Sequence, residues 1–507
     1  MSIGRQSETV WKGLSQSPLD VLIIGGGISG AGVARDAAMR GLKVGLVEQH
    51  DFAFGTSSRS SRLLHGGLRY LAQGRVGLVQ EASVEKTIIH RIAPHLAEPL
   101  PFIFPTYRGD RHWELWQLKI GVKIYDLLCR GRNLGRSTWL NQGEVLQRVP
   151  DLAGAGLNGA VRYYDGLTND ARLVLDTLRS ADRSGAGVLN YCQFKDATRK
   201  EEWDCHIEDC LAGKVIQVRA RAVVSATGPW AEQVPHSRVK LRLTKGVHLV
   251  VDRSRLGLSD TVVMTEGKRI LFAIPWGERT ILGTTDTDYA GPLDRVTADA
   301  ADVDYMLRIA NRFFPRARLA PDDVISTWAG LRPLIADLSG KPSDVSRSHE
   351  IRSPEPGWWD VAGGKLTTYR LMAEQTVDGI VKWRKRSNQL GPAIAPCRTA
   401  EEPLLASAET AGISGILPPP FNRRVVEHSC ANEWAVHLDD VMVRRTSWQH
   451  YCPDACQRAE RVAEWMGECF GWSAETRRAE IERYRAAVDL PLARTVSALA
   501  GRVAGAG

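Results

Sequence analysis

A glycine-rich turn near the start of the chain limits the possible folds more than any other feature of the sequence. Residues 21–24 form a short, β-branched apolar run that is typical of a buried parallel strand. Gly25, Gly27 and Gly30 then fill the three places of G-x-G-x-x-G, and a predicted helix and a second apolar run at 44–47 follow. The first glycine permits a tight turn, the second lets the backbone approach a pyrophosphate, and the third lets the helix pack on the strand. This spacing predicts a dinucleotide-binding unit.

An acidic residue, Glu48, follows the second apolar run directly. Its carboxylate is placed to accept hydrogen bonds from the two ribose hydroxyls of a dinucleotide and would repel a 2′-phosphate, so NADP is disfavoured. The unit alone does not distinguish FAD from NAD. No second fingerprint with a following acid occurs, which favours a single cofactor that is held permanently.

The composition is that of a globular protein of several domains. The chain has 507 residues, 43% hydrophobic and 24% charged, which excludes a disordered, collagen-like or small disulfide-stabilised protein. Its nine cysteines include no C-x-x-C pair, so we expect reduced thiols and no metal site. The first twenty residues are polar, and no run approaches the ~18 apolar residues of a membrane-spanning helix. We therefore expect a protein of the cytoplasm or of the cytoplasmic face of a membrane.

Several motifs follow the fingerprint in a fixed order. Residues 56–70 read T-S-S-R-S-S-R-L-L-H-G-G-L-R-Y. Shorter motifs follow: D-A-R-L-V at 170–174, A-T-G-P-W at 226–230, K-G-V-H at 245–248, I-P-W at 274–276, G-T-T-D at 283–286, G-L-R-P-L at 330–334 and G-G-K-L-T-T-Y-R at 363–370. With these motifs the chain resembles the FAD-dependent glycerol-3-phosphate dehydrogenases, the respiratory, membrane-associated branch of the D-amino-acid-oxidase-like flavoproteins. The resemblance covers about residues 18–380. Arg59 departs from it, where alanine is common, as does Ser29, where many members have asparagine.

The resemblance implies a fold of the α/β class with an added helical part. It comprises a Rossmann-like FAD-binding domain interleaved with an antiparallel-sheet substrate domain, and a C-terminal helical domain. The expected segments are 18–90, 150–240 and 325–380 for the FAD-binding domain, 91–149 and 241–324 for the substrate-binding (capping) domain, 390–415 for a linker rich in Pro, Ala, Gly and Ser, and 416–507 for the helical domain. In the last of these, an apolar stripe at helical spacing from residue 459 to residue 470 predicts core packing.

The resemblance also implies a set of FAD-binding residues. They are Gly25, Gly27, Ile28, Ser29, Gly30, Glu48, Thr56, Ser57, Ser61, Leu64, His65, Gly66, Gly67, Ala226, Thr227, Gly228, Gly364, Lys365, Leu366 and Thr367.

The implied reaction is oxidation of sn-glycerol 3-phosphate to dihydroxyacetone phosphate, with hydride transfer to FAD. This chemistry requires a base for the hydroxyl proton and cations for the phosphate. The candidate substrate-binding residues are Arg69, Tyr70, His248, Arg332 and Lys365. His248 is the candidate base because its ordinary pKa lies near working pH. Arg332 is the second catalytic candidate, since a guanidinium can instead stabilise a developing alkoxide, and the choice of base stays open here.

Two basic and aromatic stretches suggest contact with anionic lipid. Residues 108–136 carry Arg108, Arg111, Lys119, Lys123, Arg130, Arg132 and Arg136, interleaved with Trp113, Trp116, Tyr125 and apolar residues. The run 381–386 is similar. The family passes its electrons to a membrane quinone, so we expect peripheral association with the inner face of the cell membrane. An ordinary solvated amphipathic helix is the alternative. The family also suggests a homodimer.

Two other functions compete with this one. The first is an FAD-dependent amine or amino-acid oxidase of the same fold that uses oxygen, in which Arg69 and Lys365 would bind a carboxylate. The second is a non-catalytic binding protein with structural FAD. The net charge of +8 permits nucleic acid, but no recognised nucleic-acid-binding pattern occurs, and we expect no such partner.

Overall fold

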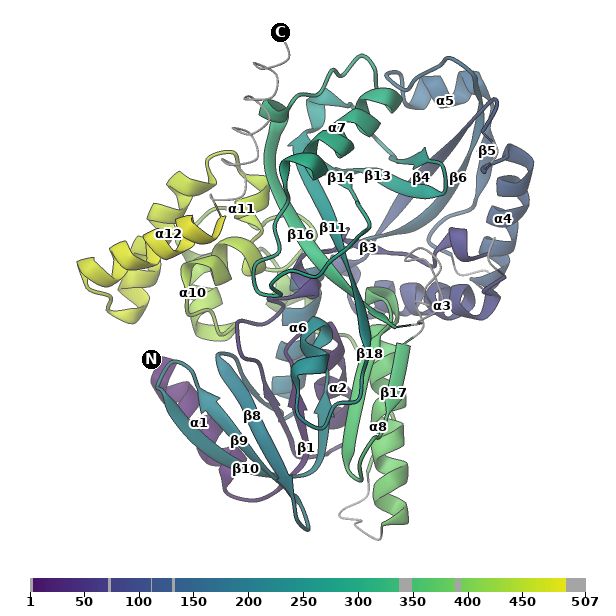
Figure 1. Ribbon diagram of the computed structural model, residues 1–507. Coiled ribbons are helices and arrows are strands. Elements are labelled where there is room, and N and C mark those ends of the chain that lie inside the picture. The colour runs from purple at the N-terminus through teal and green to yellow at the C-terminus, as the bar shows by residue number, and fades with distance from the viewer. Residues whose placement is uncertain are drawn as a thin grey trace.

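The computed structural model describes residues 3–71, 74–110, 112–129, 133–336, 349–387 and 394–488, apart from the side chains of residues 3–8 and Arg69. It contains two sheets with helices around them, and a helical C-terminal part at one side (Figure 1).

The first sheet contains the glycine fingerprint. Its strand order is β17-β18-β10-β1-β2-β7, and the pairs along it are parallel except β17 with β18. The strands are β1 (Leu19–Ile24), β2 (Val44–Val47), β7 (Gly187–Leu189), β10 (Lys214–Ser225), β17 (His349–Arg352) and β18 (Trp358–Gly363). Two further strands, β8 (Cys192–Arg199) and β9 (Trp203–Asp209), extend β10 as an antiparallel layer.

Helices cover both sides of this sheet. The helices α2 (Ile28–Met39), α6 (Asp170–Arg183) and α8 (Tyr369–Arg386) share one apolar core with β1 and β2. On the other side, α1 (Ile3–Ser15) packs with β8 and β9. Strands buried on both sides explain why β1 and β2 are continuous apolar runs rather than alternating ones.

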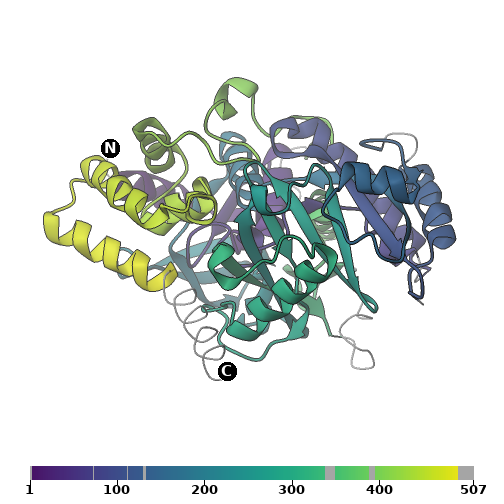
Figure 2. The same cartoon turned by 90° about the horizontal axis from the view of Figure 1, so that it is seen from above.

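The second sheet is mainly antiparallel, and Figure 2 shows it from above. Its order is β15-β11-β14-β13-β12-β4-β6-β3, with β16 paired to β11 and β5 to β6. The strands are β3 (Leu63–Leu64), β4 (Glu98–Tyr107), β5 (Thr138–Leu140), β6 (Leu157–Leu167), β11 (Leu241–Asp252), β12 (Thr261–Glu266), β13 (Arg269–Trp276), β14 (Arg279–Gly283), β15 (Thr287–Asp288) and β16 (Val324–Ile335). The helices of this part are α3 (Val76–Ile92), α4 (Leu115–Leu128), α5 (Gln142–Arg148) and α7 (Ala300–Phe313).

The chain crosses between the two sheets several times. Three strands of the second sheet, β3, β6 and β16, lie within the sequence ranges that we expected for the FAD-binding domain. Of these three strands, β16 contacts β18 of the first sheet, so it lies where the two layers meet. The domain boundaries remain a prediction.

The C-terminal part has a hydrophobic core of its own. Its helices are α9 (Ser407–Thr410), α10 (Arg423–Asn432), the π-helical turn η8 (Asp440–Arg445), α11 (Trp448–Tyr451) and α12 (Ala455–Phe470), and residues 474–488 are also helical. The stripe predicted to pack in a core does so, since Ala459, Val462 and Met466 are buried. The fold therefore confirms the predicted class: an α/β sheet, an antiparallel-rich sheet and a C-terminal helical region.

The described part of the expected linker, residues 394–415, is packed against α2. The buried guanidinium of Arg35 donates hydrogen bonds to the carbonyl oxygens of Thr399 and Glu402. Leu404 and Leu405 are buried as well. Among the described residues, no helix is both long enough and apolar enough to span a membrane.

Candidate active site

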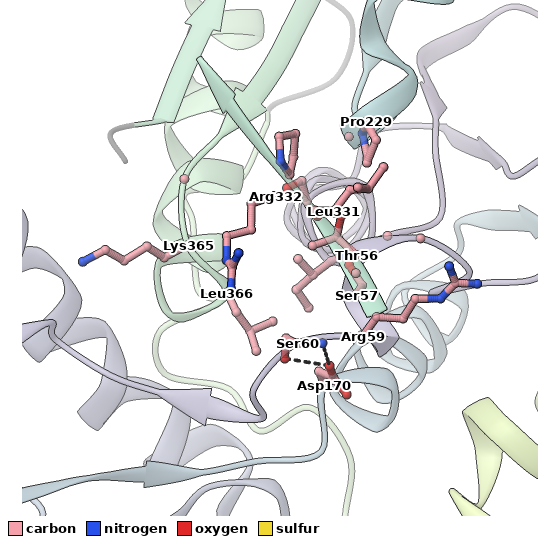
Figure 3. Close-up of a pocket in the computed structure, with 18 of the residues that line it drawn as sticks. Thr56, Ser57, Arg59, Ser60, Asp170, Pro229, Leu331, Arg332, Lys365 and Leu366 are labelled. Atoms are coloured by element: carbon pink, nitrogen blue, oxygen red, sulfur yellow. Dashed lines mark hydrogen bonds between the residues drawn. The ribbon is translucent and has the colours of Figure 1, made fainter. Parts of the chain in front are cut away.

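A cavity of about 550 Å³ lies where the two sheets meet. The carboxyl ends of β1, β2 and β10 form one wall, and residues of β4, β11, β13 and β16 form the other. Figure 3 shows residues of this cavity, with Arg332, Lys365 and Leu366 on one side and Ser57 and Arg59 on the other. Its size and mixed lining are those of a cofactor or substrate pocket.

The glycine fingerprint forms the turn between β1 and α2. Gly25 has a φ of +109°, and a Cβ there would lie 2.6 Å from the carbonyl oxygen of Ala226. A Cβ on Gly30 would overlap the carbonyl oxygen of Gly25, so only glycine lets α2 start this close to the strand. Gly27 is the N-cap of α2, and its backbone faces the cavity. The helix N-terminus and the exposed turn suit an anionic group such as a pyrophosphate.

Glu48 lies at the end of β2, where the fingerprint predicts it. Its two carboxylate oxygens accept hydrogen bonds from the backbone N–H groups of Gly26, at 2.7 Å, and His50, at 2.9 Å. Burial raises the pKa of Glu48, and the two N–H donors oppose that shift. The turn therefore holds the carboxylate against the cavity before any ribose binds.

The serine-rich loop after Glu48 is fixed at several points. The Ser57 hydroxyl accepts the N–H of Ile28 at 3.0 Å, and the Thr56 hydroxyl donates to the carbonyl oxygen of Leu331 at 2.7 Å. The backbone N–H and the hydroxyl of Ser60 both donate to Asp170, the first residue of α6, as Figure 3 shows. The loop thereby joins the fingerprint helix, α6 and β16 around the cavity.

Arg59, the unusual residue of this loop, lies at the edge of the cavity. Its guanidinium is 5.2 Å from the ring centre of Phe54. Burial and the positive charge of the neighbouring Arg444 together lower the pKa of Arg59 to about 10.

All predicted FAD-binding residues line the cavity except Gly30, Leu64 and Gly66. Gly30 packs against Gly25 as described, Leu64 is fully buried, and the N–H of Gly66 points to the hydroxyl of Tyr125. Thr367 fixes the loop from the opposite side, because its hydroxyl accepts from the N–H of His65 at 3.0 Å and donates to the carbonyl of the same residue.

His248 stands on β11 and is only 2% exposed. Its Nε2 lies 2.8 Å from the hydroxyl of Ser61, and its ring stacks on Trp328, with the centres 5.1 Å apart. Burial holds the pKa of His248 well below its usual range, and the positive charges of Arg332 and Arg62 lower it further. The imidazole is therefore neutral at neutral pH.

Arg332 reaches the same cavity from β16. It donates to the hydroxyl of Thr284 at 2.9 Å and to the carboxylate of Asp286 at 3.1 Å. A Cβ on Gly246 would collide with the Arg332 guanidinium, and a Cβ on Gly283 would collide with the His248 ring. These contacts explain the glycines of K-G-V-H and G-T-T-D, which leave room for the two catalytic candidates.

Lys365 and Tyr70 form another polar corner of the cavity. The Lys365 ammonium donates to the carbonyl oxygen of Gly66 at 3.2 Å and lies 4.4 Å from the centre of the buried Tyr70 ring. Gly67, with a φ of +86°, leaves room for both side chains. The side chain of Arg69, also predicted here, lies outside the described part of the structure.

Some residues in and around the cavity were not predicted from the sequence. Thr284 and Asp286 belong to a motif that was recognised, but only the strand register brings them to Arg332. An apolar wall was also missed. It is formed by Phe102, Phe104, Tyr163, Val263, Ile270 and Phe272 from four strands. Alternation along those strands is the only sequence signal for it. Within the described ranges, no group of three or more potential metal ligands occurs.

The fold and the cavity define an FAD-dependent oxidoreductase. The family described as FAD dependent oxidoreductase matches residues 20–377, and the C-terminal domain of alpha-glycerophosphate oxidase matches residues 415–477.

Similar proteins of known name identify the family within this class. An aerobic glycerol-3-phosphate dehydrogenase of Staphylococcus saprophyticus is 39% identical over 402 residues, covering 77% of this chain and 72% of the relative. Glycerol-3-phosphate dehydrogenase 2 of Mycobacterium tuberculosis is 34% identical over 539 aligned positions, covering 96% and 90%. The crystal structure of the glycerol-3-phosphate dehydrogenase from Bacillus halodurans complexed with FAD has a TM-score of 0.76 and 29% identity, covering 97% of this chain and 98% of that one. The chain therefore belongs to the FAD-dependent glycerol-3-phosphate dehydrogenase family, as the sequence motifs predicted, and its cofactor is FAD.

The residues of the cavity fit FAD. The glycine turn leaves its backbone open at the start of α2, and Glu48 is held at the end of β2. The hydroxyl of Thr227, which lines the same wall, is buried and has no hydrogen-bond partner within the described residues. A dinucleotide supplies the missing partners: an anion for the turn, hydroxyls for the carboxylate and acceptors for Thr227.

Proposed function

We propose that this protein oxidises sn-glycerol 3-phosphate to dihydroxyacetone phosphate and passes the electrons to a membrane quinone. The observation that carries the proposal is one cavity in which the glycine fingerprint faces His248, Arg332 and Lys365. The family of the chain supports the substrate. FAD, when bound, supplies the hydride acceptor.

His248 is the proposed proton acceptor at the substrate hydroxyl. A neutral imidazole is the form that can take a proton, and the lowered pKa keeps His248 in that form. Nε2 lies 2.8 Å from the Ser61 hydroxyl, and either atom can donate in this pair. For Nε2 to accept the substrate proton, the ring hydrogen must be on Nδ1 and the Ser61 hydroxyl must point its hydrogen away from Nε2. Stacking on Trp328 fixes the plane of the ring.

Arg332 is proposed to stabilise the negative charge that develops on the substrate oxygen. Its guanidinium stays charged at all working pH values, and Thr284 and Asp286 hold it in place before the substrate arrives. A donor held in advance stabilises the transition state without reorganisation.

Lys365 and Tyr70, with Arg69, are proposed to bind the phosphate. The Lys365 ammonium is a cation with three N–H donors, a chemistry that suits phosphate oxygens, and it lies over the Tyr70 ring beside the Gly66 carbonyl. A phosphate is a better partner for these cations than the single carboxylate of an amino acid.

Membrane contact is proposed through α4 and the neighbouring β5. Trp116, Ile120, Ile124 and Leu127 follow one face of α4 and are 58, 53, 42 and 77% exposed, and Trp139 on β5 is 58% exposed. Lys119 lies over the Trp139 ring at 4.2 Å, which adds positive charge to the apolar face. An exposed apolar and aromatic stripe with lysines suits the interface of an anionic bilayer, from which a quinone is reached.

Other residues of the two stretches predicted to bind lipid contact the interior of the protein instead. Tyr125 of α4 is buried. In the run 381–386, Trp383 packs against the core of the first sheet, and the buried Arg384 pairs with Asp20 at 3.0 Å. Arg111, Arg130 and Arg132 lie outside the described residues. The proposed contact therefore rests on α4 and β5.

Turnover with a panel of substrates and acceptors tests this proposal. The purified protein should reduce a soluble quinone analogue with sn-glycerol 3-phosphate but not with amino acids or amines. Hydrogen peroxide should form more slowly than reduced quinone. Turnover with an amino acid and stoichiometric peroxide would instead establish the oxidase alternative.

A further inference from the structure

A buried ionic cluster lies against the His65–Gly67 loop, and one of its members, Asp165, also lines the cavity. It consists of Lys86 on α3, Tyr125 on α4 and Asp165 on β6, each at most 2% exposed. The Lys86 ammonium donates to Asp165 Oδ1 at 2.8 Å, and the Tyr125 hydroxyl donates to the same oxygen. A buried ion pair contributes little net stability compared with apolar packing, so stability alone does not account for the cluster.

The cluster fixes the backbone N–H of Gly66 in this loop. The N–H of Gly66 donates to the Tyr125 hydroxyl at 2.8 Å and lies 3.4 Å from Asp165 Oδ1. A Cβ at position 66 would lie 2.5 Å from the Tyr125 hydroxyl and 2.6 Å from the Ser83 hydroxyl. Only glycine therefore permits this contact, and the contact fixes the orientation of the peptide.

The other end of the same residue contacts the proposed phosphate site. The Gly66 carbonyl oxygen accepts from the Lys365 ammonium at 3.2 Å, and the ammonium lies over the Tyr70 ring. The cluster and Lys365 thus lie on opposite sides of Gly66. A change in the orientation of this residue would move the acceptor of Lys365.

We propose that Tyr125, Asp165 and Lys86 are positioning residues for the substrate phosphate, acting through Gly66 on Lys365. This inference rests on the proposed function, because it takes Lys365 to be a phosphate ligand. Lys86 and Tyr125 do not line the cavity, and Asp165, which does, is proposed to act through Gly66 rather than by contact with the phosphate. Lys86 neutralises Asp165, Asp165 orients the Tyr125 hydroxyl, and that hydroxyl sets the Gly66 peptide.

The test is the Tyr125→Phe variant, which removes one hydroxyl and keeps the ring. We expect the KM for sn-glycerol 3-phosphate to rise about fivefold to tenfold, the equivalent of one lost hydrogen bond. The Kd of inorganic phosphate, read from the change in flavin absorbance on titration, should rise by a similar factor. The kcat and the FAD content should stay within about twofold of the wild-type values, since the hydride-transfer groups are unchanged.

The matched control is Tyr107→Phe. Tyr107 is a partly buried tyrosine at the end of β4, and its hydroxyl donates to the carbonyl of Ala153 at 3.1 Å, away from the cavity. The Tyr107→Phe variant should have a lower free energy of unfolding, with no change in the KM for sn-glycerol 3-phosphate or in the phosphate Kd. The inference is overturned if Tyr125→Phe behaves like this control, or if its KM rises while its phosphate Kd is unchanged. If wild-type flavin is not reduced by sn-glycerol 3-phosphate, the proposed function fails, and the phosphate titration still decides the role of Tyr125.

Discussion

At the scale of single residues, the motifs are explained by what lies against them. Gly246 and Gly283 leave space for Arg332 and His248, and Gly67 leaves space for Lys365 and Tyr70. The sequence predicted that these motifs belong to one site. It did not predict the partners Thr284, Asp286, Tyr125 and Asp165, because those contacts depend on strand register and on residues far apart in the chain.

The role of His248 is tested with His248→Ala. We expect flavin reduction by sn-glycerol 3-phosphate to slow about 10²-fold to 10⁴-fold, the usual contribution of a general base, with FAD still bound. Stopped-flow absorbance measures the rate. His206→Ala is the control and should react like wild type, because the His206 side chain on β9 is 42% exposed and does not line the cavity. A near wild-type rate in His248→Ala would leave Arg332 as the only catalytic candidate.

The pH dependence of stability follows from buried histidines. Burial and the positive charges of nearby Arg62 and Arg59 together lower the pKa of His450 to about 3. In the unfolded chain His450 is protonated below about pH 6.5, whereas in the folded chain it stays neutral down to about pH 3. His450 therefore has no effect on the free energy of unfolding above about pH 6.5 and lowers it as the pH falls from about 6.5 toward 3. His437 opposes this trend, because Glu480 raises its pKa despite burial.

We expect His450→Gln to reduce the loss of stability by about 1 kcal/mol per pH unit between pH 6 and pH 4, close to the full effect of one titrating group. Urea unfolding of both proteins at several pH values measures the two slopes. Parallel slopes would show that His450 titrates alike in the folded and unfolded chains.

At the scale of elements, apolar runs predicted the right strands and missed their pairing. The predicted runs at 21–24 and 44–47 lie within β1 and β2. The pairing of β11 with both β14 and β16, which assembles the site, joins residues up to about ninety positions apart. Local patterns carry no information on such pairs, and the interleaving of the segments came only from the family resemblance.

The outer face of α4 makes a prediction for membrane binding. The double variant Ile120→Glu with Leu127→Glu removes two exposed apolar side chains, each worth about 1.5–3 kcal/mol when buried in lipid. Its binding to vesicles of phosphatidylglycerol and phosphatidylcholine should weaken at least about tenfold in a sedimentation assay. Flavin reduction should be unchanged, since these side chains point away from the cavity.

Leu211→Glu serves as the control, because Leu211 is 47% exposed but lies beside the first sheet, between β9 and β10. It should bind vesicles like wild type. Equal weakening in both variants would mean that α4 is not the docking surface.

At the scale of the whole molecule, buried ion pairs join the C-terminal region to the first sheet. The Arg172 guanidinium of α6 makes two hydrogen bonds of 2.7 Å to the Glu433 carboxylate, and Arg445 donates to Asp51, three residues after Glu48. All four side chains are almost fully buried. Although burial alone would raise the pKa of Glu433, Arg172 and His428 hold it far below its usual range. The sequence predicted a helical C-terminal region but not this attachment, because charged residues rarely indicate burial.

Glu433→Gln tests the attachment. The substitution removes the negative charge that pairs with the buried Arg172 guanidinium. Because that guanidinium stays buried, the free energy of unfolding should fall by about 3–5 kcal/mol. Glu427→Gln, in an exposed pair with Arg423 on the neighbouring helix α10, should cost less than about 1 kcal/mol. Chemical denaturation followed by tryptophan fluorescence compares the two. Equal and small losses would show that the C-terminal region is held by its apolar contacts alone.

The most direct test of the whole account is anaerobic reduction of the bound flavin. The yellow protein is mixed with sn-glycerol 3-phosphate without oxygen, and the absorbance near ~450 nm is followed. Rapid bleaching, reversed by a quinone analogue, is the predicted result. A flavin that stays oxidised with sn-glycerol 3-phosphate but bleaches with an amine or amino acid would contradict the proposed substrate and leave only the fold and the cofactor standing.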